Sequence, residues 1–327
     1  MGKKLWIVLG GLVGLPLLVL LAFFLEAHLE IRSLEAPLPT EAERAAFAAG
    51  ARGPVSIEWV ESGRQARADG GVSTTGSFFL RWPDGRGFLI DAGMTADEML
   101  AFGAALETAM GAGPIRVFGS VAAQIGRASR RIEGVGFTHL HHDHTDGAED
   151  LCAARDGAPL SLFQVGDQAE RGNYTTDPGR ARVEAAACLE RVRLGAAGGA
   201  AEGEASEVPR LHPVPGLPGL AAFAAGGHTP GSTVFVARLP DRIVYFAGDI
   251  TNEHARLLAN EGKGFVYSYL MIPENTGRLE ALRRWLAARH AEPDTFVVVS
   301  HDLSGMPEAG IALPDRGEAL GLDAALP

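Results

Sequence analysis

The sequence THLHHDHTDG, residues 138–147, is the feature that most constrains the fold of this chain. It holds four of the ten histidines and two aspartates, and it directly follows an apolar run. Imidazole is the commonest metal ligand and titrates near neutral pH, so the cluster indicates a metal site. A solvated His-rich loop or an expression tag would need no partners, whereas a metal site needs further ligands that the fold brings to it.

Five short apolar runs indicate buried strands, and each ends on an Asp or a His or leads directly into one. The runs are residues 87–91, 134–140, 221–228, 242–249 and 295–301. Two further segments, 96–110 and 276–290, indicate helices. The second has an apolar face made of Leu279, Leu282, Trp285 and Leu286. Strands mixed with amphipathic helices predict an α/β or α+β layered domain, with its chemistry at the strand ends.

The spacing within the cluster separates its side chains. Residues i and i+2 of an extended segment project to the same side, so His139 and His141 can bind one metal ion while His142 points away. Asp143 and His144 can turn toward a second ion where the chain enters a helix. One loop would then serve two metals, provided that other residues complete both sites.

Three residues elsewhere are candidates to complete these sites. His228 lies in the turn-forming sequence GGHTPGS, and His301 ends the apolar run TFVVVSH. Asp249 follows RIVYFAG, where a carboxylate on the buried side needs a cation or a donor, and it could bridge two ions. Each alone is more often a hydrogen-bonded structural residue, but the combination favours ligands. Asp91, at the end of GFLID, is placed to orient a ligand histidine.

Taken in order, these sequences resemble the metallo-β-lactamase-fold hydrolase superfamily. Its HxHxDH motif stands here at residues 139–144. The other landmarks are IDxG at Asp91, GHTPGS at His228, GD at Asp249 and SHD at His301, so the resemblance covers about residues 55–303. It implies an αββα sandwich with the site along one edge of the paired sheets.

The resemblance also implies a binuclear metal site. Metal one would be bound by His139, His141 and His228, metal two by Asp143, His144 and His301, and Asp249 would bridge them. The ions would be zinc, with iron or manganese as alternatives. Two divalent ions roughly 3.5 to 4 Å apart can hold a bridging hydroxide near neutral pH. Asp143 or Asp249 could relay a proton to the leaving group of an ester, lactone, thioester or related small molecule.

Two ligand positions narrow the branch of the superfamily. True zinc β-lactamases generally lack a bridging aspartate at the position of Asp249, and flavodiiron-type relatives usually carry Glu where His141 stands. The chain therefore looks more like the glyoxalase II, lactonase and phosphodiesterase branch. Residues 155–220, the expected substrate-binding region, match no subfamily. An iron-dependent persulfide dioxygenase of the same fold and a non-catalytic binding protein remain as alternatives.

The N-terminal residues predict a membrane anchor. Residues 5–25 contain no charge, and as a helix with about 1.5 Å per residue they reach roughly 31 Å, enough to span a bilayer. Lys3 and Lys4 precede this segment, so the positive-inside rule places the rest of the chain at the periplasmic or exterior side of the cytoplasmic membrane. A cleaved signal peptide is the alternative, but its apolar region usually runs only about 7 to 15 residues.

The sequence also predicts domains and partners. We expect an anchor at residues 1–27, a linker at 28–54, a metallo-β-lactamase-fold domain at 55–305 and a tail at 306–327. The net charge of −11 argues against binding to nucleic acid, so a small-molecule substrate is expected. Cys152 and Cys188 would face an oxidising compartment, where one disulfide or two buried thiols remain equally open.

Overall fold

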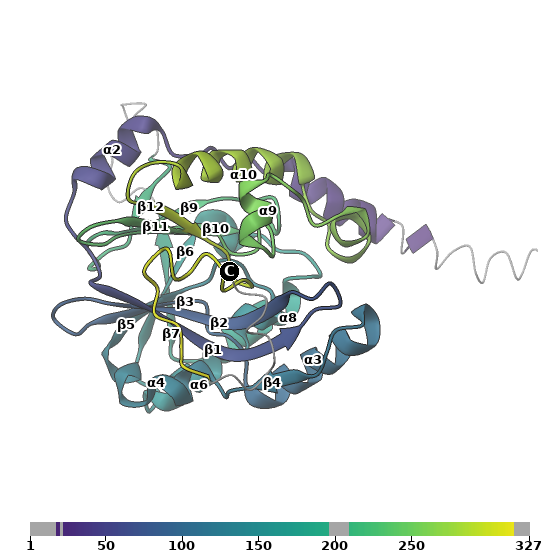
Figure 1. The fold of residues 1–327 in the computed structure, drawn as a ribbon, viewed down its shortest axis with the longest axis horizontal. Coiled ribbons are helices and arrows are strands. Elements are labelled where there is room, and N and C mark those ends of the chain that lie inside the picture. The colour runs from purple at the N-terminus through teal and green to yellow at the C-terminus, as the bar shows by residue number, and fades with distance from the viewer. Residues whose placement is uncertain (1–17, 20–21, 196–208, 317–327) are drawn as a thin grey trace, which may run out of the picture.

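Two β-sheets pack face to face between two layers of helices (Figure 1). The computed structural model describes residues 18–19, 22–195 and 209–316. The first sheet has the order β4 (Ile115–Val117), β1 (Ser56–Ala66), β2 (Val72–Arg81), β3 (Gly87–Ile90), β5 (Ile132–Gly136), β6 (Leu160–Val165) and β7 (Leu189–Leu194). The second has the order β12 (Thr295–Val298), β11 (Ile243–Phe246), β10 (Thr233–Arg238), β9 (Leu220–Ala224) and β8 (His212–Pro213).

Both sheets are mixed. Strands β3, β5, β6 and β7 run parallel, whereas β1, β2 and β3 pair antiparallel. In the second sheet β11 and β12 are parallel and the other pairs are antiparallel. Parallel neighbours place their carboxyl ends at the same edge of a sheet, which is where ligand sites commonly lie in such folds.

The helices cover the outer face of each sheet. The first sheet is covered by α3 (Ala96–Met110), α4 (Val121–Ile125), α6 (Ala148–Ala154) and α8 (Asp177–Ala185). The second is covered by α2 (Glu41–Ala49), α9 (His254–Leu258) and α10 (Thr276–His290). Shorter elements are the 3-10 helix η1 (Gly126–Arg131), α5 (His142–Thr145), α7 (Gly166–Glu170) and the π-helix η2 (Val266–Met271). Residues 22–33 are also helical.

Aromatic side chains from both sheets form the central core. The ring of Phe78 on β2 lies 4.8 Å from that of Phe246 on β11, measured between centroids. Phe88 on β3 and Phe235 on β10 are 5.9 Å apart. All four are at most 1% exposed, and burying each contributes about 1.5 to 3 kcal/mol. This packing fixes one sheet against the other, and with it the relative position of their strand ends.

The predicted layered fold is confirmed. The five apolar runs overlap β3, β5, β9, β11 and β12, and each strand ends before the Asp or His that follows it. The predicted helices coincide with α3 and α10. On α10, Leu279, Leu282 and Leu286 are buried, and Trp285 is half-buried.

Most of the predicted anchor, residues 5–25, lies outside the described residues, which include only 18–19 and 22–25 of it. Among the helices that the structure does describe, none combines the length and the apolar character needed to cross a membrane. The anchor and its orientation therefore stay predictions.

Segments on both sides of residues 55–305 pack against that domain. Ile31, in the helix of residues 22–33, is fully buried, and Arg44 on α2 forms an ion pair with Glu292 at 3.1 Å. At the other end Met306 and Ile311 are buried. The described parts of the predicted linker and tail thus belong to the packed unit, whereas the domain boundaries stay predictions.

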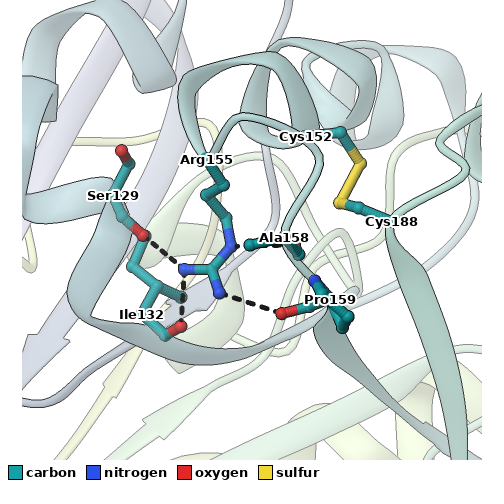
Figure 2. Close-up of a disulfide and its surroundings, with 7 residues drawn as sticks. All are labelled: Ser129, Ile132, Cys152, Arg155, Ala158, Pro159 and Cys188. Atoms are coloured by element: carbon teal, nitrogen blue, oxygen red, sulfur yellow. Dashed lines mark hydrogen bonds between the residues drawn. A yellow bond between two sulfur atoms is a disulfide. The ribbon is translucent and has the colours of Figure 1, made fainter.

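Cys152 and Cys188 form a disulfide, which decides between the two alternatives that the sequence left open (Figure 2). The bond joins α6 to the residue before β7. Beside it, Arg155 donates to the carbonyls of Ser129 and Ile132 at 2.6 and 2.9 Å. These links tie α6, which follows the histidine-rich loop, to the first sheet.

Candidate metal centre

Seven His and Asp side chains from four loops meet at one edge of the two sheets. Each loop follows the carboxyl end of a strand: β5, β9, β11 or β12. All seven residues are at most 9% exposed. They are His139, His141, Asp143 and His144 after β5, His228 after β9, Asp249 after β11 and His301 after β12. The structure therefore brings together all seven predicted ligands.

The backbone near the site supports this convergence at two unusual positions. Gly248, before Asp249, adopts a φ of 59°, and a Cβ there would lie 2.8 Å from the Cβ of Thr138. Asp91 adopts a φ of 67°, which costs a non-glycine residue on the order of 1 kcal/mol. The backbone N–H of Thr138 donates to the Asp91 carboxylate at 2.7 Å and helps to hold this conformation.

The first group consists of three histidines. Ring nitrogens of His139, His141 and His228 all lie within 4.8 Å of one another. Their ring centroids are 4.5 to 4.7 Å apart. This arrangement can supply three nitrogen ligands to one ion. We call it the histidine group.

The second group combines carboxylates with histidines, and we call it the carboxylate group. Potential ligand atoms of Asp143, His144 and His301 lie within 4.8 Å of one another. His301 Nε2 is 3.3 Å from Asp143 Oδ2 and 3.0 Å from Asp249 Oδ2. Asp249 Oδ2 also lies 3.9 Å from His228 Nε2. Asp249 therefore stands between the two groups, at the position that a bridging carboxylate needs.

Each of the five histidines has one ring nitrogen that contacts a residue outside the cluster. Such contacts fix the ring orientation and leave the other nitrogen directed into the site. The partners are Thr138 for His139 (3.2 Å), Thr175 for His141 (3.1 Å), Asp91 for His144 (2.9 Å), Glu274 for His228 (2.6 Å) and the carbonyl of Thr74 for His301 (2.7 Å).

Several inward atoms are buried and lack a hydrogen-bond partner among the residues described. They are Nε2 of His139, His144 and His228, and Oδ1 of Asp249. Buried polar atoms without partners are rare because they lose the hydrogen bonds they would make with water. Cations bound between them would satisfy all four, and imidazole with carboxylate is a typical ligand set for divalent transition metals. The residues therefore fit metal ions in both groups.

The two groups differ in electrostatics. Burial lowers the pKa of His139, His141 and His228 below the ordinary histidine value. Burial would also lower the pKa of His144, but the charges of Asp143, Asp91 and Asp249 outweigh it and raise that pKa to about 9. The histidine group is thus neutral at pH 7.

His301 follows His144 in the carboxylate group. Asp249 and Asp143 outweigh the effect of burial and raise the pKa of His301 well above its ordinary value. The pKa of both carboxyls is lowered in turn, because the histidines overcome the opposing effect of burial. In the absence of metal, the carboxylate group therefore holds protonated histidines against ionised carboxylates.

Glu274 is a site residue that the sequence did not reveal. It is 1% exposed, lies between η2 and α10, and accepts hydrogen bonds from His228 Nδ1 and from Ser268 Oγ. Burial opposes ionisation, but Lys263, 3.4 Å away, and His228 lower its pKa to about 2. No motif surrounds Glu274 in the sequence, and only the fold brings it to a histidine 46 residues away.

His142 points away from the other histidines of the loop, as the alternation predicts. Its Nε2 lies 3.1 Å from Asp146 Oδ1 and 3.7 Å from Glu98 Oε2. These three residues could hold an ion by spacing alone, but Arg182 Nε already lies 3.1 Å from Asp146. The arginine supplies the positive charge there, so we interpret this cluster as an ion-pair network.

Comparisons with known proteins agree with the fold. The model of the metallo-beta-lactamase superfamily matches residues 70–301. A search of curated proteins found no match.

Several solved structures share the fold. A mutant of AiiA from B. thuringiensis, with N-decanoyl-L-homoserine bound at its active site, has a TM-score of 0.54 and 10% identity, covering 80% of this chain and 98% of that one. An N-acyl homoserine lactone hydrolase with its product at the catalytic metal center has a TM-score of 0.53, 10% identity and the same coverage. A probable metal-dependent hydrolase from Staphylococcus aureus has a TM-score of 0.52 and 14% identity, covering 77% and 91%.

Proposed function

Because the chain belongs to the metallo-β-lactamase superfamily, we propose that it is a binuclear metal-dependent hydrolase of an ester, lactone, thioester or related small molecule. The observation that carries this proposal is the set of buried inward atoms without partners in the described part of the chain. They are Nε2 of His139, His144 and His228 and Oδ1 of Asp249.

The ligand assignment follows the two groups. The histidine group would hold one ion, the carboxylate group would hold the other, and Asp249 would contact both. We propose zinc, with iron or manganese as alternatives, because imidazole and carboxylate ligands suit all three. Divalent ions in such a site polarise a substrate oxygen and lower the pKa of a bound water.

The surrounding residues orient the ligands and move protons. Asp91 and Glu274 hold the rings of His144 and His228, each through the outer ring nitrogen. Asp143 and Asp249 have lowered pKa values, so both are ionised at neutral pH and can accept a proton. Either carboxylate could take the proton of an attacking water and pass it to the leaving group.

Lactones are the substrates to test first. One of the solved structures with this fold is an N-acyl homoserine lactone hydrolase, and another holds N-decanoyl-L-homoserine at its active site. Their sequence identity to this chain is only 10%, so a broader panel of esters, thioesters and phosphodiesters should accompany the lactones.

Metal quantification followed by this substrate panel tests the proposal. About two divalent ions per chain and turnover of at least one substrate are the expected results. Iron together with O₂ uptake on a persulfide would favour the dioxygenase instead. Metal-loaded protein that turns over nothing in the panel would favour a non-catalytic binding role.

We also propose that residues 5–25 anchor the chain in the cytoplasmic membrane with the domain outside. The disulfide between Cys152 and Cys188 supports this orientation, since disulfides persist in oxidising compartments. Protease added to spheroplasts should digest the domain and spare cytoplasmic markers. Recovery of the domain as a soluble, N-terminally trimmed protein would instead indicate a cleaved signal peptide.

A further inference from the structure

Exposed apolar side chains are concentrated in two segments of the described structure. Nine of the thirteen large hydrophobic residues that are exposed there lie within residues 18–29 and 265–271. Each of the nine is 45 to 67% exposed. Single exposed hydrophobic residues need no explanation, but a concentration of this kind marks an interaction surface.

The two segments are neighbours in space. His28 Nε2 lies 3.0 Å from the carbonyl oxygen of Tyr269, and the two rings stack with centroids 5.8 Å apart. Figure 1 shows the purple helix of residues 22–33 beside the green segment that carries η2. We call the exposed apolar side chains of these two neighbouring segments the apolar platform. Its residues are Phe23, Leu25, Leu29, Phe265, Val266 and Leu270.

The platform is connected to the candidate metal centre on both of its sides. From η2, Ser268 Oγ donates to Glu274 at 2.6 Å, and Glu274 holds the ring of His228. From the helix, the ring of Phe23 lies 5.0 Å from that of Tyr174. The next residue, Thr175, contacts His141 at 3.1 Å. Both links end at ligands of the histidine group, so the platform flanks that side of the site.

The sequence indicates what covers this surface. The uncharged residues 5–25 include Phe23 and Leu25 of the platform and lead directly into Leu29, so a membrane span there would hold the neighbouring residues 265–271 at the lipid surface. Charges beside it have both signs, because Glu26 and Glu30 are accompanied by Arg32 and Arg171. Such a surface suits the apolar boundary of a bilayer, which binds by buried apolar area.

We propose that the apolar platform inserts into the outer leaflet and that the substrate is an amphiphile with a long acyl chain. Its head would reach the metal centre while the chain stays in the lipid. Hydrolysis adds the hydroxyl of water to the acyl carbon and leaves the second proton on the departing alcohol or thiol. This substrate class rests on the proposed hydrolase function, whereas insertion of the platform does not.

Insertion can be measured on the full chain reconstituted in phosphatidylcholine vesicles. Phe265→Trp places a fluorophore on the platform, and Leu100→Trp places one at a 52% exposed position of α3 on the other sheet. The vesicle lipids carry brominated acyl chains, which quench tryptophan fluorescence, and the signal of the wild type is subtracted as background. We expect the fluorescence of the added tryptophan to be quenched at least about twofold more in the platform variant than in the α3 variant. Equal quenching of the two variants would overturn insertion. If the emission of the platform tryptophan changed with protein concentration instead, the platform would be covered by a second copy of the chain.

The substrate class needs a second experiment. We expect the double variant Phe265→Ser, Leu270→Ser to lower the ratio of long-chain to short-chain ester hydrolysis about tenfold in vesicles, with unchanged metal content. Leu100→Ser is the matched control and should leave the ratio unchanged. An unchanged ratio in the double variant would overturn the substrate class. If neither ester is hydrolysed by the wild type, the hydrolase function fails, and the quenching result still decides insertion.

Discussion

His228 and His301 reach the same edge from strands β9 and β12 of the second sheet, yet their pKa values are shifted in opposite directions. His228 Nδ1 lies 3.4 Å from the ammonium of Lys263, and burial lowers its pKa. His301 Nε2 lies within 3.3 Å of both Asp143 and Asp249, and those carboxylates raise its pKa. The comparison teaches that the histidine group is ready to bind a cation at neutral pH, whereas the carboxylate group must first release protons.

Removing Asp249 should have the largest effect, because it contacts both groups. Asp249→Ala should lower turnover by more than about a hundredfold and reduce metal content in both groups. Its strand still packs through Val244 and Phe246, so the variant should fold, but the metal-free protein should melt somewhat lower because the contact of Asp249 with His301 at 3.0 Å is lost. Metal analysis, kinetics and thermal melting on the same variant measure these effects. A destabilised variant with wild-type metal content and turnover would contradict the bridging role.

The second largest effect is expected from removing one nitrogen ligand of the histidine group, and the same loop offers a matched control residue. His141→Ala removes a nitrogen from that group and should lose most of the activity. His142→Ala only disturbs the contact with Asp146 and should keep much of it. Steady-state kinetics on both variants checks the difference. Equal losses would show that the alternation of side chains along this loop does not separate ligands from other residues.

The residues that hold the rings offer a sharper comparison of the two groups. Glu274→Gln acts on His228, and Asp91→Asn acts on His144. Each should weaken metal binding by about 10- to 100-fold in its own group only. Competition with a chelator measures the metal affinity of each group separately in both variants. Loss of both affinities in either variant would mean that the groups are not independent.

The smallest effect is expected when metal removal and pH are used to test the different protonation states of the two groups. In the metal-free protein the pKa of His144 is about 9, above its ordinary value of 6.5. Its ion pairs therefore stabilise the fold fully below about pH 6.5, and this stabilisation is lost as the pH rises through about 9. We expect the metal-free protein to lose more melting temperature over this range than the metal-loaded protein. A metal-free melting temperature that rises with pH would contradict this assignment.

The sequence predicted those features whose signal is local. The seven candidate ligands lie in four segments that each follow an apolar run, and these runs end at one edge because the strands do. Strand β1 was not predicted, since Glu61, Arg64 and Gln65 make it look polar. Glu61 is nevertheless fully buried and pairs with Arg64 at 2.7 Å.

Features that depend on long-range contacts had no such signal. Glu274, Thr74 and Thr175 touch ligand histidines only because the chain folds, and nothing in their sequence neighbours indicates this. The apolar platform is a similar case. The sequence around Phe265 and Leu270 does not indicate that they are exposed beside the N-terminal helix, as the structure shows.

Titration of the metal-free full chain with zinc at pH 7, with bound ions counted and activity followed, is the most direct test of the binuclear site. Two neighbouring groups joined by Asp249 predict two ions bound per chain. Proton release should accompany binding to the carboxylate group, and full turnover should appear only when both groups are filled. Full activity with one ion per chain, or with none, would contradict it.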